Sequence, residues 1–461
     1  IDAFNRDLPY DEFLRRQLAG DELYPGDESA LIATHFCLSG PDMPDINLQE
    51  ERRHTLLNDI TGTLGASLLA LQIGCAECHD HKYDPISQAD FYRLRAIFEP
   101  AVQVTKNKSV SVLKEKNSDA EAAHLMLRGD FRRPGPVVQP DFPRIANPGL
   151  DVFRAAELKN STGRRTAFAM WLTDPRNPLT ARVWVNRIWQ HHFGTGLSDT
   201  PSDFGLMGMP PSHPELLDWL TAWFIDHGWS LKELNRLIVT SRTWQQRSHL
   251  PAGADGEERS QWEKALVEDP QGRLLSRYPR HRLEGEAIRD SMLAAAGLLN
   301  PQAGGPGIRP PLPPELHETL LKNQWDVTED VTQHDRRSIY LFARRNLRYP
   351  LFDVFDRPSA NLTCPVRPES TTAPQALELL NSSFSHRVSL AMAEQITKDH
   401  ADAVSQITDA FQRTLSRAPV DAELEESLNF LQVSAEAGVT ADQLQPFCLA
   451  LLNLSEFVEV E

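Results

Sequence analysis

Apolar residues recur every three or four positions along most of this chain, and that spacing predicts α-helices. The longest apolar stripe starts after residue 48 and consists of Leu56, Ile60, Leu64, Leu68 and Leu71. Such a stripe predicts one long helix with a buried face. Because the stripe runs directly up to Gly74, we expect the segment that follows to be presented at the end of this helix.

Start and stop signals divide the rest of the chain into further helices. Pro9 and Gly20 mark the two ends of a short amphipathic helix, and Ser87 is placed to cap another helix after Pro85. Similar signals predict helices at residues 7–20, 164–173, 179–192, 216–227, 231–243, 282–299, 375–380, 385–398, 402–415, 421–437 and 441–452. The predicted fold class is therefore mainly α, with many helices.

One proline-rich stretch interrupts this helical pattern. Residues 101–161 contain Pro134, Pro136, Pro140, Pro143 and Pro148. Within them, residues 124–130 fit a short strand that ends in a turn. We expect this stretch to be a linker between two domains. The predicted domains are residues 1–100 and residues 162–461, with the linker at 101–161.

Composition narrows the class of protein. The chain of 461 residues is 41% hydrophobic, which is enough to build real cores. Its formal net charge is −17, whereas a nucleic-acid binder needs a basic surface, so nucleic acid is not an expected partner. No stretch approaches the roughly 20 apolar residues of a membrane span. We therefore expect no membrane span in this part of the protein.

The chain begins at Ile1, without an initiator methionine and without a basic-then-apolar leader. We therefore expect a fragment whose N-terminus, together with any signal peptide, has been lost. The cysteines do not indicate a disulfide framework, because Cys37, Cys364 and Cys448 stand far apart in the sequence.

The remaining two cysteines carry the main chemical signal. Cys75, Cys78 and His79 have the C-x-x-C-H spacing that is typical of covalent haem attachment in c-type cytochromes. Two thiols about one helical turn apart can add to the haem vinyl groups, and the histidine directly after them can reach the iron. With 5 cysteines and 15 histidines in the chain, chance predicts on the order of 0.002 such pentapeptides. We therefore expect haem c, attached to Cys75 and Cys78, with His79 as an iron ligand.

Other interpretations of the same residues stay open. Cys75 and Cys78 could bind zinc together with His79 or His81, although a zinc ribbon would need a second closely spaced cysteine pair. The two thiols could instead serve thiol redox chemistry, or form a reduced turn beside a surface histidine. If haem is bound, Asp80 and His81 are candidates for the hydrogen bonds that tune it.

A second axial ligand for such a haem has only weak candidates. They are His124, Met126, His191, His192 and His213, although packing or a surface position is the commoner role for such residues. The aromatic residues Phe91, Tyr92 and Phe98 on the next predicted helix fit either a porphyrin-facing surface or an ordinary core.

Arginines gather near residue 345 of this acidic chain. Arg344, Arg345 and Arg348 follow a short apolar run at residues 338–343, which fits either a strand or a helical segment. Guanidinium groups suit carboxylate, sulfate or haem propionate groups, so an anionic ligand is one interpretation. The other is pairing with the many carboxylates of the protein.

Several runs of sequence together resemble a known family. They are Cys75–Ile86 with Asp90–Tyr92, Leu8–Asp11 with Gln17–Asp21, Asn177–Arg182, Asn186–Trp189, His213–Asp218, Glu286–Asp290, Ser370–Leu377 and Leu451–Phe457. Over nearly the whole chain, they resemble the large secreted proteins of Planctomycetes that join a planctomycete cytochrome C domain to a planctomycete-specific domain of unknown function. Full members of that family start earlier, and many have a longer segment before the position of His124.

This resemblance implies a periplasmic or cell-surface protein with a redox role. The simplest activity is electron transfer from a covalent haem to a redox partner protein, linked to polysaccharide degradation. One alternative is a haem- or metal-dependent enzyme on anionic or sulfated polysaccharide, gripped by Arg344, Arg345 and Arg348. Another is a zinc-containing or purely structural binding module without redox activity.

Overall fold

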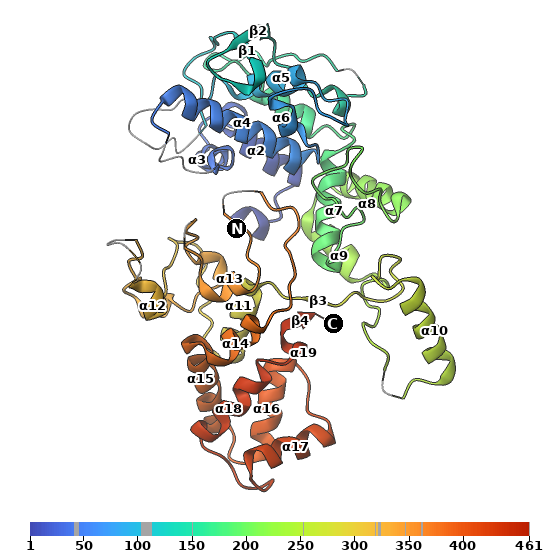
Figure 1. Ribbon diagram of the computed structural model, residues 1–461, viewed down its shortest axis with the longest axis vertical. Helices are drawn as coiled ribbons and strands as arrows, with labels where there is room; N and C mark the ends of the chain where they lie inside the picture. Colours follow the sequence, from blue (N-terminus) through green and yellow to red (C-terminus); the bar gives the residue numbers. More distant parts are fainter. Residues whose placement is uncertain are drawn as a thin grey trace. The chain divides into compact units, whose positions relative to one another are not determined.

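The protein is seen in a computed structural model (Figure 1), which describes residues 1–40, 46–102, 113–149, 151–251, 253–318, 320, 324–345, 347–360 and 363–460. As predicted, its structure is mainly α-helical. The chain divides into two compact units. Unit 1 consists of Ile1–Pro279 with Asn361–Pro365, and unit 2 consists of Arg280–Ala360 with Val366–Glu461.

Unit 1 is built from helices and one two-stranded ribbon. Its α-helices are α1 (Asp2–Asn5), α2 (Tyr10–Leu23), α3 (Glu28–Ala33), α4 (Gln49–Leu68), α5 (Gln88–Phe98), α6 (Arg164–Leu172), α7 (Thr180–Phe193), α8 (Pro214–Asp226), α9 (Leu231–Val239) and α10 (Gly256–Glu268). Its 3-10 helices are η1 (Thr34–Leu38), η2 (Ile73–Glu77), η3 (Leu127–Gly129) and η4 (Arg144–Ala146), and its strands are β1 (Ala123–Met126) and β2 (Pro134–Val138).

Helix α5 forms part of the core of unit 1, between α4 and α6. It begins where the sequence predicts, because the Ser87 hydroxyl and the Asp90 carboxylate form a capping box at its first turn. Phe91, Tyr92 and Phe98 are completely buried and pack inside the protein. The interpretation of these three rings as a porphyrin-facing surface is therefore wrong.

Residues 101–161, as far as they are described, pack within unit 1. Strands β1 and β2 pair antiparallel and lie on α5, a ribbon that Figure 1 shows beside that helix. The Phe142 ring stacks on Trp171 with 4.7 Å between ring centroids, and Arg144 donates to the Asp90 carboxylate at 2.9 Å. The prolines thus stand at a strand edge and in packed turns. The boundary between the two compact units falls near residue 280, and the division into domains 1–100 and 162–461 with a linker at 101–161 stays a prediction.

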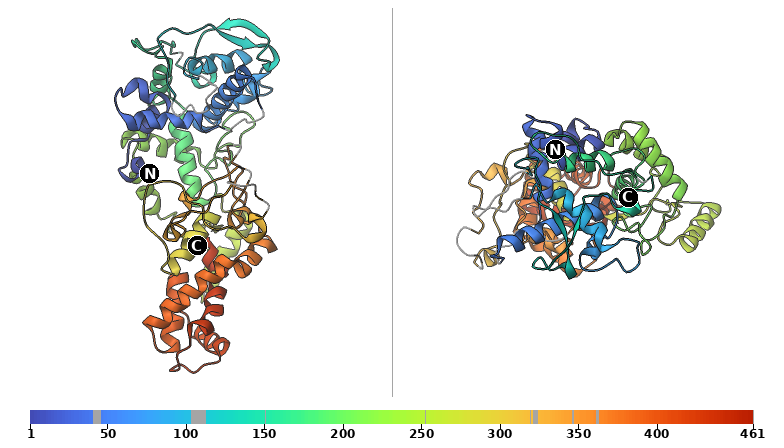
Figure 2. Two further views of the ribbon diagram at one scale, coloured as in Figure 1. Left: turned by 90° about the vertical axis from the view of Figure 1, so that its left-hand side faces the viewer. Right: turned by 90° about the horizontal axis from the view of Figure 1, so that it is seen from above.

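Unit 2 is a helical bundle preceded by irregular chain. Its elements are β3 (His281–Arg282), α11 (Gly285–Ala295), α12 (Pro314–His317), η5 (Val331–Gln333), η6 (Ser338–Tyr340), α13 (Pro350–Val354), α14 (Ala373–Asn381), α15 (Ser383–Asp399), α16 (Ala403–Leu415), α17 (Asp421–Leu431), α18 (Ala441–Leu451), α19 (Ser455–Val458) and β4 (Glu459–Val460). Helices α15 and α18 pack along each other, as the views in Figures 1 and 2 show. Their contact buries Val388, Met392, Leu444 and Cys448.

Among the described residues, no helix combines the length and the apolar character that crossing a bilayer requires.

Candidate functional site

The Cys-x-x-Cys-His segment lies in the connection between α4 and α5. Helix α4 ends at Leu68, where the backbone amides of Leu69 and Leu71 both donate to the Gly65 carbonyl. Ala70 then has a left-handed backbone with φ of 49°. The prediction that the long helix itself presents the segment is therefore wrong. The apolar spacing continues to Leu71 because the residues after the helix end are buried as well.

The 3-10 helix η2 contains Cys75 and ends directly before Cys78. Gly65 lets η2 lie directly on α4, because a Cβ there would be 2.1 Å from Cγ2 of Ile73. Ile73 and Ala76 are completely buried against the core. Cys75 lies within η2, Cys78 follows directly as its C-cap residue, and both cysteines are exposed.

Both thiols are available for chemistry. Neither Cys75 nor Cys78 has a disulfide partner, and both are exposed. Partial burial raises the pKa of the Cys78 thiol above its usual value, and the negative charge of Glu77 raises it further. The thiol form of Cys78 is therefore favoured over the thiolate at neutral pH.

His79 presents one free ring nitrogen. Its Nδ1 lies 2.7 Å from the backbone carbonyl of Asp80, and a carbonyl can only accept, so Nδ1 carries the proton. Within the described part of the chain, Nε2 has no hydrogen-bond partner. Fixing the proton on Nδ1 leaves the lone pair on Nε2, which is the arrangement that histidine uses to bind metals.

Side chains from α4 and α5 hold the turn from beneath. The Glu77 carbonyl accepts hydrogen bonds from the Tyr92 hydroxyl at 3.1 Å and from the Gln88 side chain at 2.9 Å. The Glu77 carboxylate accepts one from Asn58 at 2.7 Å. Burial raises the pKa of that carboxyl group. The backbone between the two cysteines is therefore fixed by the surrounding helices.

Asp80 and His81 shape the connection from the motif to α5. Asp80 Oδ1 accepts a 2.8 Å hydrogen bond from the Gln88 amide in the first turn of α5, where a helix favours negative charge. His81 Nδ1 accepts from the Asp84 amide at 2.8 Å. Their predicted role in tuning a haem stays a prediction.

A third histidine, His54, also supports the turn. Its Nδ1 lies 3.2 Å from Nη1 of Arg95, and a guanidinium can only donate, so His54 Nδ1 accepts and Nε2 carries the proton. Nε2 therefore donates to the Gly129 carbonyl at 3.1 Å. Burial, and then the charge of Arg95, lowers the pKa of His54 to about 4. Gly129 lies against Cys78, because a Cβ there would be 2.7 Å from its Sγ atom.

Our sequence reasoning missed His54, although a signal exists. His54 stands on the same helical stripe as Leu57, Thr61, Leu64 and Leu68, all of which are buried. A polar residue on such a stripe needs a buried hydrogen-bond partner. The partners come from Arg95 and Gly129, which are distant in sequence and could not be read from α4 alone.

An open cleft of about 480 Å³ lies beside this turn. It is lined by Glu51, His54, Asn58, Glu77, Asp130 and Phe131, among others. The imidazole of His54 and the ring of Phe131 are 5.9 Å apart between centroids. The side of the motif that carries Glu77 is thus accessible to solvent through this cleft.

The candidates for a second axial ligand have different surroundings. His124 Nδ1 lies 2.9 Å from the Gly135 carbonyl, His192 Nε2 lies 2.7 Å from Asn235, and His213 Nδ1 lies 3.0 Å from Ser212. His191 is exposed at the last turn of α7. Met126 is connected to the motif, because Gln88 donates to the carbonyls of both Met126 and Glu77.

The predicted anion-binding arginines belong to unit 2 and have separate partners. Arg344 donates to the Gln324 carbonyl, and Arg348 pairs with Asp353 at 2.8 Å. Arg345 is half-buried. Anion binding by Arg344, Arg345 and Arg348 stays a prediction.

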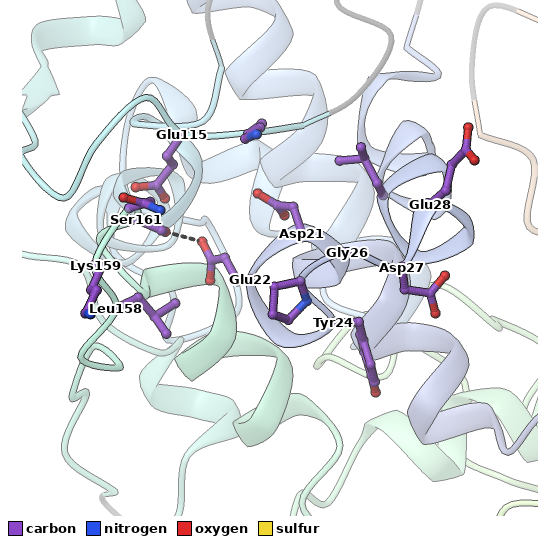
Figure 3. A pocket seen from close by; sticks show the side chains of 14 residues that line it. Asp21, Glu22, Tyr24, Gly26, Asp27, Glu28, Glu115, Leu158, Lys159 and Ser161 are labelled. Atoms are coloured by element: carbon purple, nitrogen blue, oxygen red, sulfur yellow. Dashed lines mark hydrogen bonds between the residues drawn. The ribbon is translucent and has the colours of Figure 1, made fainter.

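A second cavity of unit 1, of about 510 Å³, is lined by carboxylates (Figure 3). Behind it lies Arg165, which is 0% exposed and bonds both Asp21 oxygens at 2.7 and 2.8 Å. Glu22 accepts from Ser161 at 2.6 Å, the dashed contact in Figure 3, and Glu115 accepts from the Thr162 amide at 2.7 Å. These carboxylates are held by internal partners.

In the described ranges, no three side chains of His, Cys, Asp or Glu form a group that could hold a metal ion. Zinc binding by Cys75, Cys78 and His79 or His81 stays a prediction.

Fold and site together define a mainly helical protein with an exposed Cys-x-x-Cys-His turn held between two helices. Residues 164–431 match PSD1, described as a protein of unknown function (DUF1553), and residues 1–103 match PSCyt2, described as a protein of unknown function (DUF1549). The first match covers more than half of the chain, which therefore belongs to the PSD1 family. Along the chain, PSCyt2 comes first and PSD1 second, which is the pair of the planctomycete cytochrome C domain and the domain that follows it, and this confirms the predicted family. No curated protein and no solved structure matches the chain.

Proposed function

We propose that this protein is a c-type cytochrome-like protein of the periplasm or the cell surface. It carries a haem on Cys75 and Cys78 and transfers electrons to a redox partner protein. The observation that carries the proposal is the exposure of both cysteines, Cys75 within η2 and Cys78 directly after it, with His79 next in the chain. Haem is attached to thiols outside the cytoplasm, which supports the location. The family resemblance supports a link to polysaccharide degradation.

The residues of the turn suit a covalently held haem. Cys75 and Cys78 offer two thiols for thioether bonds, and His79 offers the lone pair of Nε2 because its Nδ1 proton is held by the Asp80 carbonyl. A bound haem would supply one-electron redox chemistry. The part of this chain is to hold the thiols and the imidazole in one orientation, through the hydrogen bonds that α4 and α5 make to Glu77.

The proposal is tested by export of the protein to a periplasm equipped for haem c maturation. The absorption spectrum and a pyridine haemochrome assay are recorded for wild type and for the double variant Cys75→Ala/Cys78→Ala. Wild type should retain haem in denaturant, and the double variant should lose it. Cys364→Ala, which removes an exposed cysteine outside the motif, is the matched control and should retain haem.

A colourless wild-type protein under these conditions would contradict the proposal. Metal analysis of that protein would then separate the remaining interpretations. Stoichiometric zinc that is lost in the double variant would indicate a zinc site, and the absence of any metal would indicate a structural turn.

A further inference from the structure

A loop distant in sequence is fixed beside the Cys-x-x-Cys-His turn. The amide of Phe204 donates to the Ala70 carbonyl at 2.7 Å, and the Gln72 side chain donates to the Ser202 carbonyl at 2.8 Å. On the other side of the motif, the amide of Leu206 donates to Asp84 Oδ1 at 2.7 Å. The loop is thus bonded to the chain both before and after the motif.

Two further features hold this loop in place. Arg187 donates to the Ser202 hydroxyl at 3.0 Å and to the Ala66 carbonyl at 3.1 Å, which connects the loop to the last turn of α4. The side chain of Asp84 is only 1% exposed and lies so close to Gly205 that a Cβ there would be 2.5 Å from its carboxylate. Only glycine allows this approach, so the position of the loop against the motif is built into the sequence.

The same loop presents apolar side chains to solvent. Leu206 is 74% exposed, Met207 is 58% exposed and Met209 is 48% exposed. Single exposed apolar residues are common on protein surfaces, but three within four positions on a fixed loop form a patch. Such a patch indicates a surface that is covered by another group.

The turn itself provides no exposed apolar side chain from η2 or α5. Ile73 and Ala76 of η2 are buried in the core, and so are Phe91, Tyr92 and Phe98 of α5. A porphyrin attached at Cys75 and Cys78 is a large and mainly apolar group. Tyr83, which is 49% exposed, is the large apolar side chain that the connection between η2 and α5 offers to such a group, so further contact surface comes from a segment beside the turn.

We propose that the loop Leu206–Met209 is the apolar surface against which the haem attached to Cys75 and Cys78 packs. This inference rests on the proposed function, and it names residues outside the motif that define the haem environment. Asp84 acts as a positioning residue, because its buried carboxylate holds the Leu206 amide. Burial by such a surface raises the reduction potential of a haem by excluding water.

Methionine oxidation followed by mass spectrometry tests this proposal. Wild-type protein carrying covalent haem is compared with the haem-free variant Cys75→Ala/Cys78→Ala under the same mild oxidant. Met207 and Met209 should be oxidised several-fold more slowly in the haem-containing protein, because haem covers their sulfur atoms. Met170 on α6 is 47% exposed and is the internal control, which should be oxidised equally in both proteins.

The outcomes separate this proposal from the proposed function. A positive haemochrome with equal oxidation of Met207 and Met209 in both proteins would overturn the docking surface and leave haem attachment standing. A negative haemochrome would overturn both.

A second variant keeps the test independent of oxidation chemistry. Leu206→Ser should lower the reduction potential of the attached haem, because it makes the apolar surface polar. Leu274→Ser, at a leucine that is 60% exposed and lies after α10, is the control and should leave the potential unchanged. An unchanged potential in Leu206→Ser would contradict the proposal.

Discussion

Two groups of ionisable side chains in unit 1 differ in their exposure: one is bonded to internal partners, and the other is left open to solvent. Around Arg165, the carboxylates of Asp21, Glu22 and Glu115 are buried and bonded to internal partners. At the Cys-x-x-Cys-His turn, the backbone is bonded by neighbouring helices, while the thiols and the imidazole stay exposed. Buried polar groups are normally satisfied, so groups held rigidly but left open indicate a site for an external partner.

The Arg165 cluster is best explained as a structural tie. The guanidinium bonds Asp21 and Glu22 at the end of α2, and it lies 3.8 Å from Glu115. Arg165 itself belongs to α6, so one buried side chain joins segments that are far apart in sequence. Burial raises the pKa of Glu115 above its usual value.

The largest expected effect is therefore on stability at Arg165. Arg165→Met would leave three buried carboxylates without their cation, and removing one partner of a buried ion pair typically costs about 3–5 kcal/mol. Thermal unfolding followed by circular dichroism should show a much lower Tm for this variant.

The control for Arg165 is Arg132→Met, which removes an exposed pair with Asp130. Surface pairs contribute little, so its Tm should stay close to that of wild type. Equal Tm values for the two variants would contradict the interpretation of Arg165 as a structural tie.

An intermediate effect, on haem attachment, is expected at Gly129, which lies against the Cys78 thiol. Gly129→Ala places a methyl group 2.7 Å from Cys78 Sγ, on a backbone with φ of +74°. The thiol must move away, so covalent haem at Cys78 should fall several-fold. Mass spectrometry of the matured protein measures the fraction of chains with a thioether at that position.

Gly26 provides a matched control for the backbone. It has φ of +88°, and nothing lies within 4 Å of a Cβ built there. Both alanine variants therefore carry a similar strain of roughly 1–2 kcal/mol from the left-handed backbone, but only Gly129→Ala meets Cys78. Similar haem loss in both would show that backbone strain, and not the contact with Cys78, is responsible.

The sequence predicts features that depend on neighbouring residues better than features that depend on distant contacts. Local signals predicted the mainly helical fold, the capping of α5 by Ser87 and the strand at β1, because these depend on neighbouring residues. The end of α4 was misjudged because Leu69 and Leu71 are buried without being helical. The packing of residues 101–161 was missed because it depends on contacts such as Phe142 with Trp171.

The candidate site also combines features that depend on neighbouring residues with features that depend on residues far apart in the chain. The spacing of Cys75, Cys78 and His79 is a local signal that sequence reading can find. The support from His54 through Gly129, and the loop bonded to Asp84, join residues far apart in the chain. Such contacts appear only in the folded protein.

The smallest effect is expected at His54, and it appears as a dependence of stability on pH. Its pKa is about 4 in the folded protein, below the ordinary value of 6.5, because burial and Arg95 disfavour the charged form. The unfolded chain therefore binds more protons between these two values, and the stability that His54 contributes is lost as pH falls from about 6.5 towards 4. His54→Gln removes this titration, so Tm should fall less steeply over that range than in wild type.

The control is His227→Gln, which changes an exposed histidine at the C-terminal end of α8 and should keep the wild-type slope. Parallel curves for wild type and His54→Gln would show that His54 is not held neutral between Arg95 and Gly129.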